Sequence, residues 1–371
     1  MSQFIPVSEP SITQKEVDYV ADAVKSGWVS SHGEYLLEFE ERFADFIGTR
    51  YAVSNCNGTV ALHLALLVLG IKSGDEVIVP DLTFVATANA VSYTGAKPVF
   101  VDIERNSWCI DPCDIERAIT EKTKAIIPVH LYGHPANMDD IVAIAKKHSL
   151  YIIEDCAEAH GAEYKGIKVG SFGDLSAFSF YGNKVITTGE GGMITTDNEE
   201  YYRKAKYLRD HAMSEEKRYW HTDIGYNYRM TNIQAALGVA QLERIQEILE
   251  KKRQIFEWYH KCLSNVSDIV LNPETSWAKN IFWMVSIVLT HATNNKRDDL
   301  MLKLKNDGIE TRPFFYPLSD MPMYTTHRKT DTSVAHYISE RGINLPSSAK
   351  LTFEDVEYVC GKIKEWKSST L

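Results

Sequence analysis

The sequence predicts an α/β fold in which a large domain with a mostly parallel sheet is followed by a small C-terminal α+β domain. Between about residues 50 and 200, short apolar β-rich runs alternate with segments that are apolar at helical spacing. This alternation is typical of a parallel sheet that helices cover on both faces. After residue 200 a long amphipathic run follows, and 371 residues are enough for two domains.

Local signals place the elements of the first part. A glycine ends the apolar helical run at residue 70, and Thr83 and Asp111 are side chains that commonly cap a helix start. The strands are continuous apolar runs, as expected where both faces of a sheet are buried. We expect strands at residues 76–80, 97–103, 125–129 and 151–155, and helices at residues 60–70, 83–93, 111–119 and 137–148.

The second part opens on a long helix. Thr231 and Gln234 match a capping box, and the amphipathic run behind them continues to about Trp258 as a single helix that links two lobes. We therefore expect the large domain to cover residues 1–244 and the small domain to cover residues 245–371. Within the small domain we expect a strand at residues 280–289 and helices at residues 297–307 and 353–366.

Composition narrows the classes of function. Forty Lys and Arg against fifty Asp and Glu give a net charge of −10, which disfavours nonspecific binding to nucleic acid or to an anionic membrane. The first residues lack the pattern of a signal peptide, and no apolar stretch approaches the roughly 20 residues that span a bilayer. The six cysteines are scattered without a His cluster, so we expect neither a disulfide framework nor a metal site. These features favour a cytoplasmic protein.

Small polar residues precede the helix expected at residues 60–70. Asn57, Gly58 and Thr59 leave free backbone N–H groups at the positive end of that helix, which suits a phosphate. Taken alone, such residues are more often a plain helix cap. The Lys-Ser/Thr pair of a Walker A loop and the G-x-G-x-x-G of a dinucleotide-binding turn are both missing here.

Two ionisable side chains stand where ligands bind in such folds. Asp155 ends a predicted parallel strand, and ligands of open α/β sheets bind beyond the carboxyl ends of the strands. Lys184 lies between a short apolar strand and a Gly-rich turn, where partial burial would make its amine a nucleophile toward a carbonyl. The ordinary alternatives are a salt-bridged structural acid and an exposed lysine before a turn.

Together, these three signals describe a site for pyridoxal 5'-phosphate. The helix start would bind the phosphate, Asp155 would keep the pyridinium nitrogen protonated, and Lys184 would form a Schiff base with the cofactor. Phe84 follows the strand expected at residues 76–80 and is placed to stack on the pyridine ring. Core packing is the alternative role for that phenylalanine.

Four segments, in order along the chain, carry a resemblance to a known family. They are NGT at residues 57–59, EDCAEAHG at residues 154–161, FSF at residues 178–180 leading to Lys184, and GYNYRM at residues 225–230. With these segments the chain resembles the DegT/DnrJ-type nucleotide-sugar aminotransferases, which are fold type I enzymes that use pyridoxal phosphate. The resemblance runs over essentially the whole chain.

The resemblance implies roles for individual residues. Lys184 corresponds to the Schiff-base lysine and Asp155 to the partner of the pyridinium nitrogen. Asn227 corresponds to an asparagine that reaches the phosphate from the neighbouring subunit, so a homodimer is implied and a tetramer is left open. The other cofactor positions are Gly58, Thr59 and Ser179 at the phosphate, Phe84 on the ring, and Glu158, which stands where many relatives have a glutamine near the ring oxygen.

Within the family, FYGNK at residues 180–184 and RMTNIQAA at residues 229–236 are most similar to the subgroup that makes GDP-perosamine. That subgroup transfers the amino group of L-glutamate onto C4 of GDP-4-keto-6-deoxy-D-mannose, a step of O-antigen and lipopolysaccharide biosynthesis. A guanidinium pairs bidentately with a carboxylate or a diphosphate. The candidate substrate residues are therefore Arg218, Arg229 and Arg312, with His32 and Tyr316 near the ketosugar.

Other functions share some of these features. An aminotransferase of a UDP- or dTDP-linked ketosugar has the same motifs, and only its substrate differs. A sugar 3-dehydratase of the same fold is disfavoured, because a histidine replaces the Schiff-base lysine in those relatives. A non-catalytic regulator that binds pyridoxal phosphate is an alternative from another class, and the net charge of −10 disfavours DNA binding by it.

Overall fold

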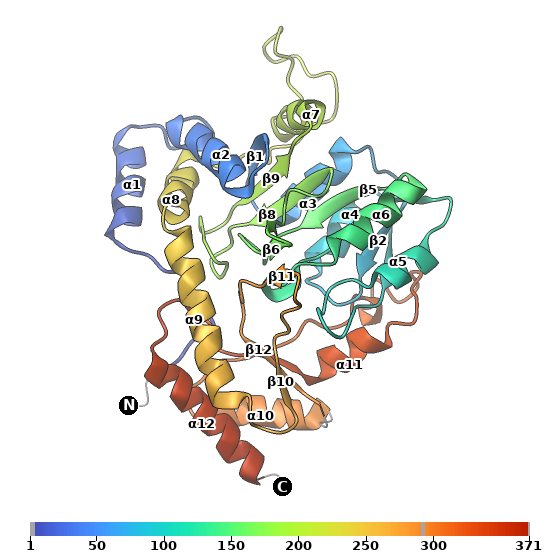
Figure 1. Cartoon of the computed structure of the whole chain (residues 1–371). Helices are drawn as coiled ribbons and strands as arrows, with labels where there is room; N and C mark the ends of the chain where they lie inside the picture. Colours follow the sequence, from blue (N-terminus) through green and yellow to red (C-terminus); the bar gives the residue numbers. More distant parts are fainter. Residues whose placement is uncertain (1–3, 291–293, 370–371) are drawn as a thin grey trace.

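A seven-stranded sheet forms the centre of the computed structural model, which describes residues 4–290 and 294–369 (Figure 1). The strand order is β1-β9-β8-β5-β4-β2-β3. β9 is antiparallel to both of its neighbours, and all pairings from β8 to β3 are parallel, so the predicted mostly parallel sheet is confirmed. The strands are β1 (Tyr51–Asn55), β2 (Glu76–Pro80), β3 (Lys97–Val101), β4 (Thr123–Ile126), β5 (Tyr151–Asp155), β8 (Leu175–Ser179) and β9 (Gly192–Thr196).

Helices cover both faces of this sheet, because successive residues of a strand point to opposite sides. In β2, Ile78 packs into one hydrophobic cluster, whereas Val77 and Val79 pack into another. The first cluster contains residues of α2 (Glu34–Ile47), α5 (Pro112–Ala118), α6 (Met138–His148) and α8 (Asn232–Leu242). The second contains residues of α3 (Gly58–Val68), α4 (Ala86–Tyr93) and α7 (Glu199–Arg209). None of the helices in the described ranges is long and apolar enough to cross a membrane.

A smaller antiparallel sheet of order β10-β12-β14-β13 lies in the second part of the chain. It shares a separate apolar core with α9, α10 and α12, and Ile5 from the start of the chain joins that core. The boundary at residues 244 and 245 stays a prediction. The elements are α9 (Ile245–Leu263), β10 (Ile269–Leu271), β12 (Ser286–Leu289), α10 (Asn294–Asn306), β13 (Arg312–Pro313), β14 (Gly342–Asn344) and α12 (Phe353–Ser369).

The two parts of the chain also pair with each other. A three-stranded sheet of order β11-β6-β7 joins a strand of the second part to two strands that follow β5. Its strands are β6 (Glu163–Tyr164), β7 (Ile167–Lys168) and β11 (Ala278–Lys279). The remaining elements are α1 (Gln14–Lys25), which packs on α8, the short η1 (Leu131–Gly133) and η2 (Leu318–Asp320), and α11 (Ser333–Arg341).

Several local predictions are confirmed. The strands expected at residues 76–80 and 151–155 coincide with β2 and β5. The capping box is present, because the Thr231 hydroxyl and the Gln234 side chain satisfy each other's backbone N–H groups at the start of α8. Asp111 caps α5 through the N–H of Cys113 at 2.8 Å.

The single long helix predicted up to Trp258 is wrong, since α8 ends at Leu242 and α9 begins at Ile245. Arg244 has φ −111° and ψ 6°, which is outside the helical region. Its guanidinium is held by Ser11 and by Glu16 of α1, at 3.3 Å and 2.8 Å. A tertiary contact therefore breaks a run that is amphipathic throughout.

Two further boundaries also differ. The helix expected from Thr83 begins at Ala86, and the Thr83 hydroxyl makes no cap. The strand expected at residues 280–289 is reduced to β12, because Phe282 has φ 50° in the left-handed region, which an extended strand excludes. These residues instead form an irregular segment that lines the cavity described below.

Adjacent acids end β5, and the first of them, Glu154, is fully buried. Its carboxylate accepts hydrogen bonds from His130 Nε2, from the N–H groups of Gly170, Phe172 and Gly173, and from the Ser176 hydroxyl. These bonds are 2.7 to 3.1 Å long. Burial would raise the pKa of Glu154, but the hydrogen bonds from His130 and the glycine N–H groups outweigh it and hold that pKa below its ordinary value. One side chain thus ties the turn before β8 to the end of β5.

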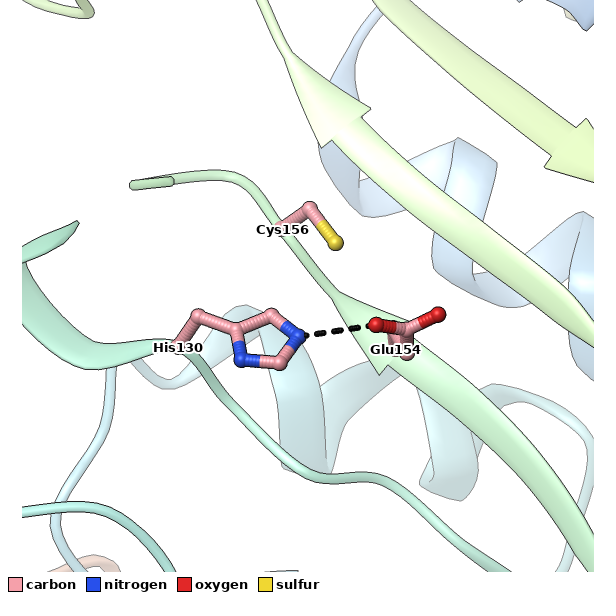
Figure 2. Close-up of side chains that lie close together, drawn as sticks. All are labelled: His130, Glu154 and Cys156. Carbon is pink, nitrogen blue, oxygen red and sulfur yellow. Dashed lines mark hydrogen bonds and ion pairs between the residues drawn. The ribbon is translucent and has the colours of Figure 1, made fainter. Parts of the chain in front are cut away.

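Figure 2 shows that His130, Glu154 and Cys156 lie together, with ligand atoms within 4.8 Å of one another. Such spacing would suit a metal ion, but the side chains of His130 and Glu154 are already engaged in hydrogen bonds. His130 Nδ1 accepts the N–H of Ala136 at 3.0 Å, so Nε2 carries the hydrogen that is donated to Glu154. His130 and Glu154 therefore belong to a structural hydrogen-bond network behind Asp155.

Replacing Glu154 with glutamine should lower the free energy of unfolding by about 3 kcal/mol, because an amide nitrogen would face N–H donors that the carboxylate now satisfies. Urea unfolding followed by circular dichroism measures this change. The matched control is Glu163→Gln, which removes a surface ion pair with Lys279 and should cost less than about 1 kcal/mol. Equal stability of Glu154→Gln and the unmodified protein would contradict the role given to Glu154.

Candidate active site

A cavity of about 790 Å³ opens beyond the carboxyl ends of β5 and β8. This is the edge of a parallel sheet at which ligands bind in α/β folds. Both parts of the chain line it. The first part contributes residues that include Asn57, Gly58, Thr59, Phe84, Thr87, Tyr132, Asp155, Glu158, Ser179 and Lys184, and the second part contributes Trp283, Met284, Arg312, Pro313, Phe315 and Asn344.

The N-terminus of α3 forms one end of the cavity. The Asn57 side chain caps the helix by accepting the N–H of Val60 at 3.0 Å. The N–H groups of Gly58 and Thr59 belong to the first turn, which has no acceptor within the helix. A Cβ on Gly58 would lie 2.7 Å from the Cβ of Ser179, so only glycine allows α3 to approach β8 this closely. Free N–H groups and a nearby hydroxyl fit a phosphate.

Asp155 lies at the base of the cavity, at the end of β5, and is 5% exposed. Its Oδ2 accepts a hydrogen bond from the Thr87 hydroxyl at 2.8 Å, and its Oδ1 accepts the N–H of Ala157 at 3.1 Å. Burial raises the pKa of this carboxyl group, although the Thr87 bond opposes the shift. Within the described residues Asp155 has no ion-pair partner. A protonated ring nitrogen would supply the missing cation.

Lys184 follows β8 and extends into the same cavity, with a side chain that is 12% exposed. Its Nζ lies 3.8 Å from Oε1 of Glu158 and 4.0 Å from the centroid of the Trp283 ring. Burial lowers the pKa of this amine, and Arg312 adds to that shift, while Glu158 and Asp155 oppose it. The neutral amine needed for attack on a carbonyl is thereby favoured.

Glu158 is a second buried acid in the cavity, and its Oε2 accepts the N–H of Tyr132 at 2.9 Å. Burial raises its pKa to about 7, although Lys184 opposes the shift. The carboxyl group is thus poised between its two protonation states near neutral pH. Its position is compatible with a place near the ring of a cofactor, which stays a prediction.

Phe84 stands at the mouth of the cavity, 53% exposed, with its ring centroid 5.7 Å from that of Phe315. It does not pack in the core, which was its alternative role. A ring exposed toward a cavity is available to stack on a flat ligand.

Asn227 and four of the predicted substrate residues do not line the cavity of a single chain, whereas Arg312 does. Arg229 forms an ion pair with Asp210, and Arg218 lies over the ring of Tyr219. Arg218 belongs to a loop after α7 that projects from the body of the molecule (Figure 1). The other three, His32, Tyr316 and Asn227, are exposed.

Sequence reasoning missed several residues of this site. Thr87 stands three residues after Phe84 in the same segment, so helical spacing could have suggested it. Trp283 and Tyr132 reach the cavity from distant segments and carry no local signal. They are found only when the two parts of the chain are folded together.

The residues present fit pyridoxal phosphate at three points. The close contact of Gly58 with Ser179 presents free N–H groups for a phosphate. The buried carboxylate of Asp155 lacks a cation within the described residues. The Lys184 amine lines the same cavity. It makes no hydrogen bond to any of the described residues and is free to bond to a carbonyl carbon.

Comparison with known proteins agrees with this geometry. The chain is 48% identical over 367 residues to a GDP-perosamine synthase of Escherichia coli O157:H7, which covers 99% of both chains. It is 44% identical to a GDP-perosamine synthase of Caulobacter vibrioides, over 97% of this chain and 98% of that one.

Solved structures share the fold. A Streptococcus pneumoniae protein described as a sugar aminotransferase, in its PLP form, superposes with a TM-score of 0.95 and 31% identity over 100% of both chains. Helicobacter pylori PseC, an aminotransferase involved in the biosynthesis of pseudoaminic acid, gives a TM-score of 0.94 and 28% identity, over 99% of this chain and 100% of that one. The family model described as the DegT/DnrJ/EryC1/StrS aminotransferase family matches residues 10–364. The chain therefore belongs to the DegT/DnrJ/EryC1/StrS aminotransferase family.

Proposed function

We propose that this chain transfers the amino group of L-glutamate onto C4 of GDP-4-keto-6-deoxy-D-mannose and so produces GDP-perosamine for O-antigen biosynthesis. The observation that carries the activity is the partly desolvated amine of Lys184, which faces Asp155 and Glu158 in a cavity beside the start of α3. The choice of substrate is supported by the names of relatives that are 44% and 48% identical over nearly the whole chain.

Pyridoxal 5'-phosphate, when bound, supplies an electron sink for the carbanion formed at the α-carbon of the amino donor. The N–H groups of Gly58 and Thr59 and the hydroxyl of Ser179 would hold its phosphate. Asp155 would hold its ring nitrogen in the protonated form, and Lys184 would bond covalently to its carbonyl carbon. Phe84 would cover one face of the ring and keep water from it.

Lys184 also moves the proton. Once an amino donor has displaced it, its Nζ is free to take the proton from the α-carbon of the donor and later to return a proton on the product side. Its pKa is lowered by burial, so a larger share of the amine is neutral and able to act as a base. Glu158, 3.8 Å away, favours the ammonium form and so helps Lys184 act as the acid in the return step.

Substrate binding needs donors for a carboxylate and a diphosphate. Arg312 lines the cavity and is the one of the predicted substrate arginines that a single chain brings to it. We propose that the active unit is a homodimer in which the partner subunit supplies Asn227 to the phosphate. The exposed Arg218, His32 and Tyr316, and the partly buried Arg229, are then candidates for the substrate side of the completed site. The domain division at residue 244 would let the smaller part close over it.

A panel of nucleotide ketosugars tests the proposed substrate. With L-glutamate as donor, GDP-4-keto-6-deoxy-D-mannose should be aminated at C4 in preference to UDP- and dTDP-linked ketosugars, with the product identified by mass and NMR. Preference for a UDP- or dTDP-linked sugar would contradict the proposed substrate but not the proposed aminotransferase activity. Failure to aminate any member of the panel, by protein with bound cofactor, would contradict the aminotransferase proposal.

Lys184→Ala should leave a folded protein whose turnover is reduced by at least about 100-fold, because the variant lacks both the covalent anchor and the proton carrier. Formation of 2-oxoglutarate from glutamate measures turnover, and circular dichroism verifies the fold. The control Lys165→Ala removes an exposed lysine paired with Asp139 and should keep full activity. Substantial transamination by Lys184→Ala would contradict the role proposed for Lys184.

Asp155→Asn should reduce turnover by about 100- to 1,000-fold, since the amide is isosteric but cannot stabilise a cation on the ring nitrogen. Steady-state rates with saturating cofactor measure the loss. Asp139→Asn is the matched control, because it neutralises an exposed aspartate that is remote from the cavity. A turnover for Asp155→Asn within a few-fold of the unmodified protein would exclude the proposed role of Asp155.

A further inference from the structure

Trp283 contacts the active lysine and the backbone next to it, from a segment of the second part of the chain. Its indole Nε1 donates a hydrogen bond to the backbone carbonyl of Asn183 at 2.8 Å. The centroid of its ring lies 4.0 Å from Nζ of Lys184. The side chain is only 4% exposed and lines the cavity. One residue therefore holds both the loop that carries Lys184 and the end of its side chain.

The backbone of Trp283 is itself fixed from behind. Its carbonyl oxygen accepts a hydrogen bond from Lys252 Nζ of α9 at 3.0 Å, and the same Nζ also donates to the carbonyl of Ser347. Lys252 is buried, so this bond is shielded from water. On the cavity side, the rings of Trp283 and Tyr132 are stacked with their centroids 6.3 Å apart. The indole ring is thus held at its backbone, at its Nε1 and at its face.

The contact with Nζ has a chemical consequence. The face of an indole ring carries partial negative charge and attracts an ammonium group within about 6 Å of its centroid. The other charged groups that face Lys184 are Glu158 and Asp155, which favour its ammonium form, and Arg312, which opposes it. The contact with Trp283 does not depend on the protonation of an acid, whereas Glu158 is poised near neutral pH. The ring therefore favours the ammonium form of Lys184 whether or not Glu158 is ionised.

We propose that Trp283 is a positioning residue for Lys184: its indole N–H fixes the Asn183–Lys184 backbone, and its ring face holds Nζ inside the cavity. This inference rests on the proposed function, in which Lys184 carries the chemistry. It assigns a part in the reaction to a residue of the second half of the chain. The irregular segment before β12, in which Phe282 has a positive φ, brings that residue to the cavity.

Two substitutions separate the two contacts. Trp283→Phe keeps an aromatic face and removes only the N–H donor, whereas Trp283→Leu removes both and leaves an apolar side chain that keeps the space largely dry. Trp277→Phe and Trp277→Leu are the controls. Trp277 lies in the same part of the chain as Trp283, but it packs against His134 and Tyr164 of the first part and does not line the cavity.

The measurement uses the full chain freed of cofactor, and it follows the rate of Schiff-base formation with added pyridoxal phosphate as a function of pH. Only the neutral amine reacts, so the midpoint of this rate profile reports the pKa of Lys184. Losing the ring face removes a stabiliser of the ammonium form, so Trp283→Leu should lower that midpoint by roughly half to one pH unit. Trp283→Phe should leave it within about 0.3 units of the unmodified value, as should both Trp277 controls.

Steady-state kinetics test the backbone contact. Trp283→Phe should lower kcat by about 10-fold with KM changed less than about two-fold, because a displaced loop misplaces Nζ relative to the reacting carbon. The Trp277 controls should keep kcat. An unchanged midpoint in folded Trp283→Leu, or an unchanged kcat in Trp283→Phe, would overturn the proposal. If Trp283→Leu fails to fold, the kcat of Trp283→Phe decides whether the proposal stands.

These outcomes are distinct from failure of the proposed function. If the unmodified chain forms no Schiff base at Lys184, as borohydride reduction and peptide mass would reveal, the proposed function itself fails. If the unmodified chain forms it and the Trp283 variants behave like the Trp277 controls, only the inference about Trp283 fails.

Discussion

The carboxylate of Glu154 satisfies donors from three separate segments, and the geometry of the active site depends on it. His130 follows β4, the three N–H donors belong to the turn before β8, and Ser176 lies in β8 itself. Because Asp155 is the next residue of the same strand, the bonds that fix Glu154 also fix the backbone of Asp155, and Thr87 and Ala157 then hold its carboxylate. A buried charge with every oxygen satisfied stabilises a single arrangement, since any other leaves donors unpaired. The cavity is therefore built on a rigid edge of the sheet.

The active site places three largely buried ionisable groups beside one cavity. If all were charged, Asp155, Glu158 and Lys184 would carry a net charge of −1 in a buried place, which is costly. Burial raises the pKa of both acids and lowers that of the amine, so burial opposes full ionisation of all three groups in the ligand-free site. A cation on a bound pyridine ring would compensate the charge of Asp155. The cofactor thus completes an electrostatic arrangement that the protein alone leaves unbalanced.

A feature can be predicted from the sequence when neighbouring residues determine it, and cannot when a distant segment of the chain does. Asp155 was placed correctly at a strand end because β5 is a short apolar run whose neighbours in the chain define it. Lys184 was singled out by its adjacent glycines and strand. Trp283 could not be found in this way, since it meets Lys184 only after the 98 residues between them have folded back. Arg244 likewise breaks a helix through its bond with Glu16, which no local pattern indicates.

The negative net charge of the chain does not prevent the binding of anionic ligands, because salt in the solvent screens charges that lie far from the site. At physiological salt, charges more than about 8 Å apart in solvent are largely screened, so most of the net −10 is not felt inside the cavity. There the nearest groups are the N–H groups at the start of α3, the hydroxyl of Ser179 and the guanidinium of Arg312. The N–H groups at the start of α3 are fixed by the helix before a ligand arrives and lose little entropy on binding, whereas the Arg312 side chain is 44% exposed. Affinity for a phosphate is therefore set by a few oriented donors, which is why the net charge disfavours nonspecific binding to nucleic acid without disfavouring a nucleotide sugar.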